Sequence, residues 1–161
     1  MTYSIGIDLG TTNSAVSYFK LDEAEARGSA QTMLTIPQIT SVGTVEGKLL
    51  LPSFLYLPNE QEFPAGSLAL PWDKKPKDGV VGEFARSHGS KVPMRLVASA
   101  KSWLCHGGVD RLSAILPWQA PEDVQRVSPL DAAARFLRLF SQPVPLIRLV
   151  IGDDEGIDCT W

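Results

Sequence analysis

A carboxylate, a glycine and two threonines lie close together near the start of the chain, in residues 5–14, which read IGIDLGTTNS. Asp8 precedes a turn in which Gly10 is followed by Thr11 and Thr12. Small residues let a backbone approach a phosphate group closely, and successive backbone amides form anion-binding concavities. Asp8 is suited to hold magnesium through water, since magnesium gives up its hydration shell reluctantly. The segment therefore predicts a site for phosphate and magnesium.

The same residues have a purely structural interpretation. Gly10 would then supply a positive φ angle for a hairpin turn, and Asp8 would cap that turn. The local pattern alone leaves both interpretations open.

Two strands are expected to position this turn. Ile5, Ile7 and Leu9 alternate with glycine and aspartate, which is typical of a buried strand over residues 3–9. Residues 14–19 are rich in aromatic and β-branched side chains and predict a second strand. We expect the two strands to form an antiparallel hairpin with the turn at its tip.

The pattern changes after this hairpin. A charged loop is expected at residues 20–30, followed by a third strand at residues 32–36 that Pro37 ends. Residues 38–93 contain frequent prolines and glycines between short apolar pieces. This region predicts a small, mostly β insertion with short strands.

Two helices are expected in the second half of the chain. The first has an apolar face that runs from Met94 to Leu104 and ends before the glycine pair at residues 107–108. The second begins at Ser128 and Pro129, an N-cap residue followed by proline at the first helical position. Its expected buried face comprises Leu130, Ala133 or Ala134, Leu137 and Phe140, with Arg135 and Arg138 on the other side. Residues 146–151 predict one more strand, and an acidic tail follows it.

The string IGIDLGTTNS closely resembles the first phosphate motif of the seventy-kilodalton heat-shock chaperones, which are actin-like ATPases. Sugar kinases of the same superfamily also use Asp-x-Gly-Thr, but Thr-Thr-Asn-Ser after the glycine points to the chaperones. Looser similarities follow in the family's order: LPSFL to its Pro-Ser-x-Val segment, VGEFAR to Val-Gly-x-x-Ala-Lys, KSWL to Lys-Arg-Leu at a helix end, and residues 127–137 to its Ser-Pro-Glu-Glu helix. The resemblance covers residues 3–140 and is strongest at the start.

This resemblance implies an α/β fold: a partial first lobe of an actin-like ATPase (ribonuclease-H-like) domain with a small β-rich insertion. Residues 1–37 would form the first strands and the phosphate loop, residues 38–127 the inserted subdomain, and residues 128–161 a return helix and an atypical tail. The implied ligands are ATP or ADP with magnesium.

The resemblance also implies the site residues. Those that would bind nucleotide are Asp8, Gly10, Thr11, Thr12 and Asn13, with Asp8 holding magnesium through water. Arg86 stands where the looser similarity places a family lysine that contacts phosphate and positions the attacking water. Arginine is larger and planar, so binding would survive this exchange while hydrolysis slows. Alternatively, Arg86 is a surface arginine.

The sequence contains no Asp-Leu-Gly-Gly-Gly-Thr, the family's second phosphate loop. We therefore expect an ATP-binding fragment of a heat-shock-type chaperone without complete ATPase activity, and the nonconforming end of the sequence indicates a premature stop. Unfolded client proteins and co-chaperones are partners of the full-length family. Alternatives are a non-catalytic interaction module, a residual truncated pseudogene product, or a small-molecule kinase of the same superfamily.

Composition narrows the class of protein further. The net charge of −3 gives no support to nucleic-acid binding, which favours a basic surface. No run approaches the roughly 20 apolar residues that a membrane helix needs, and no signal peptide is recognised. Cys105 and Cys159 are far apart, and His88 and His106 are isolated from other metal-ligating residues. We expect a cytoplasmic protein with reduced thiols and surface histidines.

Overall fold

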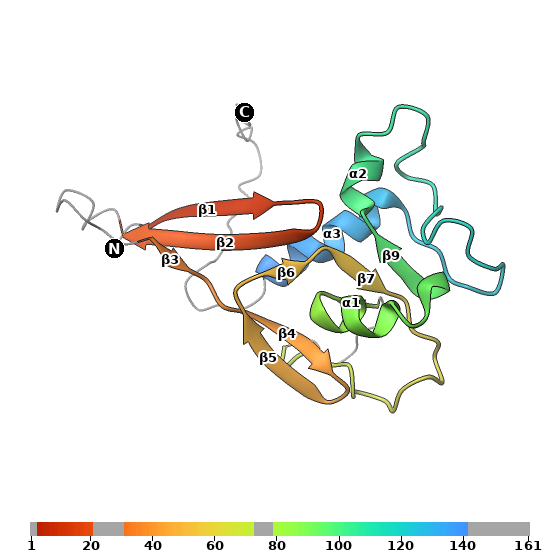
Figure 1. The fold of residues 1–161 in the computed structure, drawn as a ribbon, viewed down its shortest axis with the longest axis horizontal. Coiled ribbons are helices and arrows are strands. Elements are labelled where there is room, and N and C mark those ends of the chain that lie inside the picture. Colours follow the sequence, from red (N-terminus) through yellow and green to blue (C-terminus); the bar gives the residue numbers. More distant parts are fainter. Residues whose placement is uncertain (1–2, 21–30, 73–78, 142–161) are drawn as a thin grey trace.

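A computed structural model describes residues 3–20, 31–72 and 79–141, in which small antiparallel sheets combine with short helices (Figure 1). The mixed α/β class expected from the sequence is therefore confirmed. None of the helices in this part of the chain has the length and apolarity that crossing a bilayer requires. The predicted loop at residues 20–30, apart from Lys20, lies outside the described residues, as do the predicted strand at residues 146–151 and the acidic tail.

The predicted hairpin at the start of the chain is confirmed. β1 (Tyr3–Leu9) pairs antiparallel with β2 (Asn13–Lys20), and the last pair of the ladder joins Leu9 to Ser14. On its other side β2 pairs with β3 (Thr32–Met33) and with β6 (Leu51–Pro52). The turn between β1 and β2 therefore lies beside β6, a strand of the following region.

The expected burial of β1 is wrong. Ile5, Ile7 and Leu9 are 39–44% exposed, whereas Val16 of β2 is only 1% exposed. β1 pairs with β2 alone and forms an edge of its sheet within the described chain, while β2 has neighbours on both sides. Alternation of apolar residues shows that their side chains share one face of the strand, but it does not show whether another part of the chain covers that face.

Pro37 does not end a strand. β4 (Ile36–Ser41) contains it and pairs with β5 (Thr44–Lys48), where Pro37 lies opposite Gly47. This sheet has two strands, so each strand has an open edge at which a missing N–H group is tolerated.

A third sheet forms the centre of the described chain. β7 (Phe54–Tyr56) lies between β8 (Val80–Val81) and β9 (Leu96–Ala98). Leu55 packs in a cluster with Phe136, and the next residue, Tyr56, packs in another cluster with Phe84. Successive side chains of a strand point to opposite faces, so this sheet separates two cores.

Helix α1 (Glu83–Gly89) covers the Tyr56 face of this sheet and was not predicted. Because α1 has only seven residues and a glycine at each end, its sequence is as typical of a turn-rich connection as of a helix. Phe84 and Ala85 are its buried residues beside Gly89. The region from residue 38 onward is therefore β-rich but also contains a short helix.

The helix predicted from Met94 to Leu104 is wrong in its first half. The chain there forms a 3₁₀ turn, η2 (Pro93–Arg95), then β9, and only then helix α2 (Ala100–Leu104). Val97 pairs with Leu55 of β7. This long-range pairing overrides a local spacing of apolar residues that fits a helix equally well.

The last predicted helix is confirmed as α3 (Pro129–Ser141), and Ser128 Oγ accepts a hydrogen bond from the Asp131 amide at 3.0 Å. Its buried face is shifted from the predicted one. Leu130 and Leu137 are 49% and 45% exposed, respectively. The buried apolar side chains of the helix are Ala132, Ala133, Phe136 and Phe140. Phe140 packs with Val16 of β2, so α3 returns onto the first sheet.

Candidate functional site

The β1–β2 turn is held by the segment around β6. The Ser53 amide donates to the Thr12 carbonyl at 2.8 Å, and Ser53 Oγ donates to the Gly10 carbonyl at 3.0 Å. Asn13, half-buried at the start of β2, lies opposite Pro52 in the ladder. The turn is thus fixed at both of its sides by one neighbouring segment.

Gly10 is required by a close approach of backbone groups. A Cβ atom at this position would lie 2.5 Å from the Asn13 carbonyl oxygen, closer than such atoms can approach. Gly10 is not among the glycines with positive φ in the described chain. The interpretation of Gly10 as a positive-φ turn residue is therefore wrong.

The outer side of the turn offers hydrogen-bond donors. Thr11 and Thr12 are exposed, and within the described chain their backbone amides and hydroxyl groups donate no hydrogen bond to the protein. Exposed amides and hydroxyls close together are suited to bind an anion. Asp8, the last polar side chain of β1, is exposed beside them.

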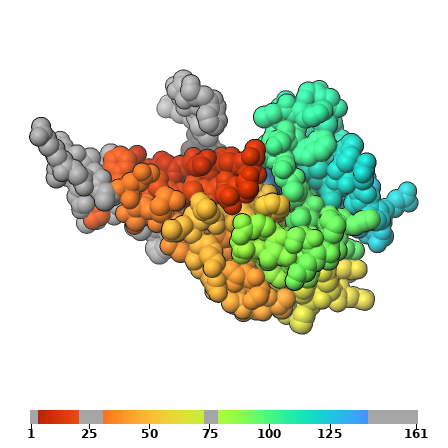
Figure 2. Space-filling view, viewed as in Figure 1, coloured from red at the N-terminus to blue at the C-terminus, as the bar shows by residue number. Residues whose placement is uncertain are grey.

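Lys101 of α2 brings a positive charge to the same turn. Its ammonium donates to the Gly10 carbonyl at 3.0 Å, to Ser14 Oγ, and to Ser53 Oγ at 3.1 Å. Ser14 and Ser53 are 1% and 2% exposed, so this ammonium is held from within the protein. Figure 1 shows the tip of the hairpin reaching α2, and Figure 2 shows the same segments in contact at the surface.

The charge of Lys101 is poorly compensated by its contacts. Burial lowers the pKa of Lys101, and the negative charge of Asp8 opposes this effect. The ammonium also lies 5.5 Å from the ring centroid of Phe136, a favourable cation–π position. All three oxygen atoms that accept from Lys101 are neutral, so its ammonium has no bonded carboxylate among the described residues.

Arg86, predicted as a neighbour of the phosphate, has another environment. Its guanidinium pairs with Glu83 at 2.7 Å on α1, and half of its side chain is exposed. α1 packs on β7 and β4, on the Tyr56 side of the central sheet. The structure brings Lys101, and not Arg86, into hydrogen-bond contact with the turn.

Sequence reasoning missed Lys101, Ser14 and Ser53 as site residues. The sequence carries a signal for Lys101, because KSWL resembles the family's Lys-Arg-Leu segment, but this resemblance indicates only a helix end. Ser53 lies within LPSFL, another matched segment. Neither match says which side chain reaches the turn, since that depends on how β6 and α2 pack.

The turn suits magnesium only through water. Within residues 3–20, 31–72 and 79–141, no three His, Cys, Asp or Glu side chains lie together as a metal site. Asp8 supplies a single exposed carboxylate. Magnesium characteristically keeps several waters and takes one or two carboxylates together with phosphate oxygens, which this arrangement fits.

Neither a protein-family model nor a curated protein matches this chain.

Proposed function

We propose that the chain binds ATP or ADP at the β1–β2 turn, as the ATP-binding part of a heat-shock-type chaperone. The observation that carries this proposal is the position of Lys101. The turn at Gly10 carries two kinds of group that can bind an anion. One is the ammonium of Lys101, which is held by neutral oxygen atoms. The other is the set of amides and hydroxyls of Thr11 and Thr12, which donate to no described residue. Anions are bound by such combinations of backbone amides and a fixed positive charge.

Each residue of the turn has a role in this proposal. Thr11 and Thr12 donate amide and hydroxyl hydrogen bonds to phosphate oxygens. Lys101 exchanges one neutral acceptor for a phosphate oxygen, because hydrogen bonds between ionised groups are stronger than those to neutral oxygens. Magnesium supplies charge neutralisation between phosphates, and Asp8 holds it through water. Gly10 and Asn13 keep the backbone in the shape that presents these groups.

An actin-like ATPase lobe is the finer fold that we propose. The chain forms a hairpin with a glycine-containing turn, then a β-rich region, then a helix that returns to the hairpin sheet. This order is the one that the sequence resemblance implies. The contact of Phe140 with Val16 and Leu51 supports it, because it places α3 against the strands that carry the turn.

A second candidate is a non-catalytic interaction module, which the surface of β1 favours. Ile5, Ile7 and Leu9 form an exposed apolar row on an edge strand of the described chain. Exposed edges with apolar side chains are surfaces on which other chains pair. Nucleotide affinity separates the two candidates, since this row needs no nucleotide to act.

The test is calorimetric titration of the chain with magnesium-ATP. Thr11→Ala and Asp8→Ala should each weaken binding, whereas Thr32→Ala, which removes an exposed threonine of β3 in the same sheet, should not. A folded chain that gives no binding heat at about 1 mM nucleotide, equivalent to about −4 kcal/mol of binding free energy, would refute the proposal. The interaction module would then be the better candidate.

A further inference from the structure

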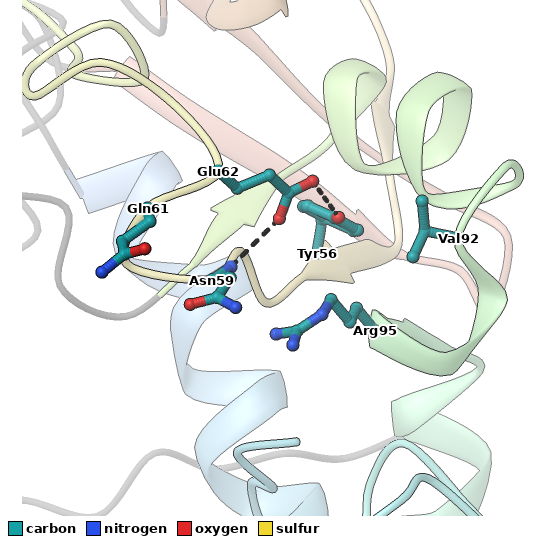
Figure 3. A pocket seen from close by; sticks show the side chains of 6 residues that line it. All are labelled: Tyr56, Asn59, Gln61, Glu62, Val92 and Arg95. Carbon is teal, nitrogen blue, oxygen red and sulfur yellow. Dashed lines mark hydrogen bonds between the residues drawn. The ribbon is translucent and has the colours of Figure 1, made fainter. Parts of the chain in front are cut away.

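A cavity that opens to the surface lies on the Tyr56 face of the central sheet, with a volume of about 320 Å³ (Figure 3). Its lining residues are Tyr56, Asn59, Gln61, Glu62, Val92 and Arg95. Lys101 lies over Phe136, which packs with Leu55 on the opposite face of β7. The cavity and the proposed nucleotide site are therefore on different sides of this sheet.

One wall of the cavity is a rigid hydrogen-bonded group around Glu62. Its Oε1 accepts from the Tyr56 hydroxyl at 2.6 Å and lies 3.2 Å from His88 Nε2, and its Oε2 accepts from the Asn59 amide at 3.0 Å. The His88 ring is stacked on Phe84 with an angle of 6° between the planes. Glu62 is thus engaged within the protein and holds this wall in place.

Arg95 provides a positive charge that lacks a bonded carboxylate. In the part of the chain that the structure describes, no carboxylate lies within 4.0 Å of its guanidinium. Its one hydrogen bond there is a long one, from Nη1 to the Leu57 carbonyl at 3.4 Å. Arg95 is half-buried, so its remaining donors are partly removed from bulk water. An anion is the ligand that such a guanidinium binds best, with two parallel hydrogen bonds to a carboxylate.

Two carboxamides, those of Asn59 and Gln61, also line the cavity. Asn59 and Gln61 are exposed, and their side chains make no hydrogen bond to other described residues. In Figure 3 the guanidinium of Arg95 points toward the amide of Asn59. A ligand carboxylate on Arg95 would therefore have amide donors and acceptors next to it, with Val92 as an apolar contact.

We propose that this cavity binds a small monocarboxylate, with the carboxylate on Arg95 and a neighbouring polar group on Asn59 or Gln61. Its volume is at the lower end of small-molecule sites, which span roughly 300–1,000 Å³. The charge of Glu62 in the same cavity disfavours ligands with two or more negative charges, such as phosphate. This site is independent of nucleotide binding, so either proposal can fail alone.

The test is a titration of the full chain with N-acetylglycine, followed by amide and side-chain NMR shifts. We expect saturable shifts at Arg95, Asn59 and Gln61 in the millimolar range. The neutral N-acetylglycinamide and inorganic phosphate should bind at least about tenfold more weakly, as should N-acetylglycine to Arg95→Gln. Lys91→Gln removes an exposed charge from the same segment outside the cavity and should bind like the unmodified chain.

Three results would overturn the proposal. The first is equal binding of the acid and its amide, and the second is unchanged binding to Arg95→Gln. The third is the absence of shifts at the cavity up to about 20 mM ligand, a concentration well above the dissociation constant expected of a fragment. If Arg95→Gln does not fold, Asn59→Ala replaces it, because Glu62 contacts the Asn59 backbone and not its side chain. Acetyl-triglycine separates two sources of the carboxylate. Tighter binding than N-acetylglycine assigns a peptide C-terminus, and equal or weaker binding assigns a small acid.

Discussion

Lys101 Nζ lies 3.0 Å from the carbonyl oxygen of Gly10, although 91 residues separate them in the sequence. Since the same ammonium also donates to Ser14 and Ser53, one side chain joins α2, β2 and the segment after β6. The shape of the turn and the position of the cation therefore depend on each other. A change at either end of this contact should alter both.

Replacing Lys101 with methionine should weaken magnesium-ATP binding by at least about tenfold, because the change removes a charged donor from the turn. Methionine keeps an unbranched stem, so the packing over Phe136 is largely retained. Calorimetric titration measures the affinity. Lys91→Met, which removes an exposed lysine away from the turn, is the control. Equal affinities of the two variants would show that Lys101 has a structural role only.

Replacing Gly10 with alanine should destabilise the chain by about 1–3 kcal/mol, the usual cost of overpacking a close contact. The added Cβ would lie 2.5 Å from the Asn13 carbonyl, so the turn must deform. Gly107→Ala is the matched control, because nothing lies within 4 Å of a Cβ at that position. Urea unfolding measures both free energies. If the two variants unfold at the same midpoint, the close approach at Gly10 is not present in solution.

Local signals in the sequence predicted the elements that depend on local physics. The hairpin of β1 and β2 followed from alternation and a glycine turn, and the start of α3 followed from Ser128 and Pro129. These signals involve residues a few positions apart, so no tertiary information is needed. The β-rich character of the middle region could be predicted in the same way.

The elements that depend on distant partners could not be predicted. Val97 belongs to a strand because β7 is available to pair with it, and a helical spacing of apolar residues cannot reveal that partner. The face of α3 was misassigned for a related reason. The spacing of apolar residues predicts Leu137 in the core, but Leu137 is 45% exposed, whereas its neighbour Phe136 has 0% exposure. Which side of the helix is buried depends on the elements that pack against it. Lys101 was missed as a site residue because its role depends on where α2 lies.

The face of α3 can be tested by two adjacent substitutions. Phe136→Ala should destabilise the chain by about 3–5 kcal/mol, the range for a fully buried phenylalanine. Leu137→Ala should cost much less, because 45% of Leu137 is exposed. Denaturant unfolding at neutral pH measures the difference. Similar losses for both variants, or a larger loss for Leu137→Ala, would contradict the packing of α3.

The cavity wall at Glu62 should make stability depend on pH in the acid range. Burial of Glu62 opposes its ionisation, but hydrogen bonds from Tyr56, Asn59 and His88 outweigh burial and lower the pKa below its ordinary value of 4.5. A carboxyl group with a lowered pKa stabilises the folded state above its unfolded pKa, and this stabilisation is lost as the pH falls through the folded pKa. Stability should therefore decrease below about pH 4.5.

Glu62→Gln is the variant that isolates this effect, since glutamine keeps an oxygen that can accept from the Tyr56 hydroxyl but does not titrate. Unfolding free energies are compared between about pH 5 and pH 3, a range that lies below the ordinary pKa of histidine. The unmodified chain should lose more stability over this range than Glu62→Gln. Parallel pH profiles would mean that Glu62 is not held by these hydrogen bonds, and the rigid wall on which the carboxylate site depends would be lost with them.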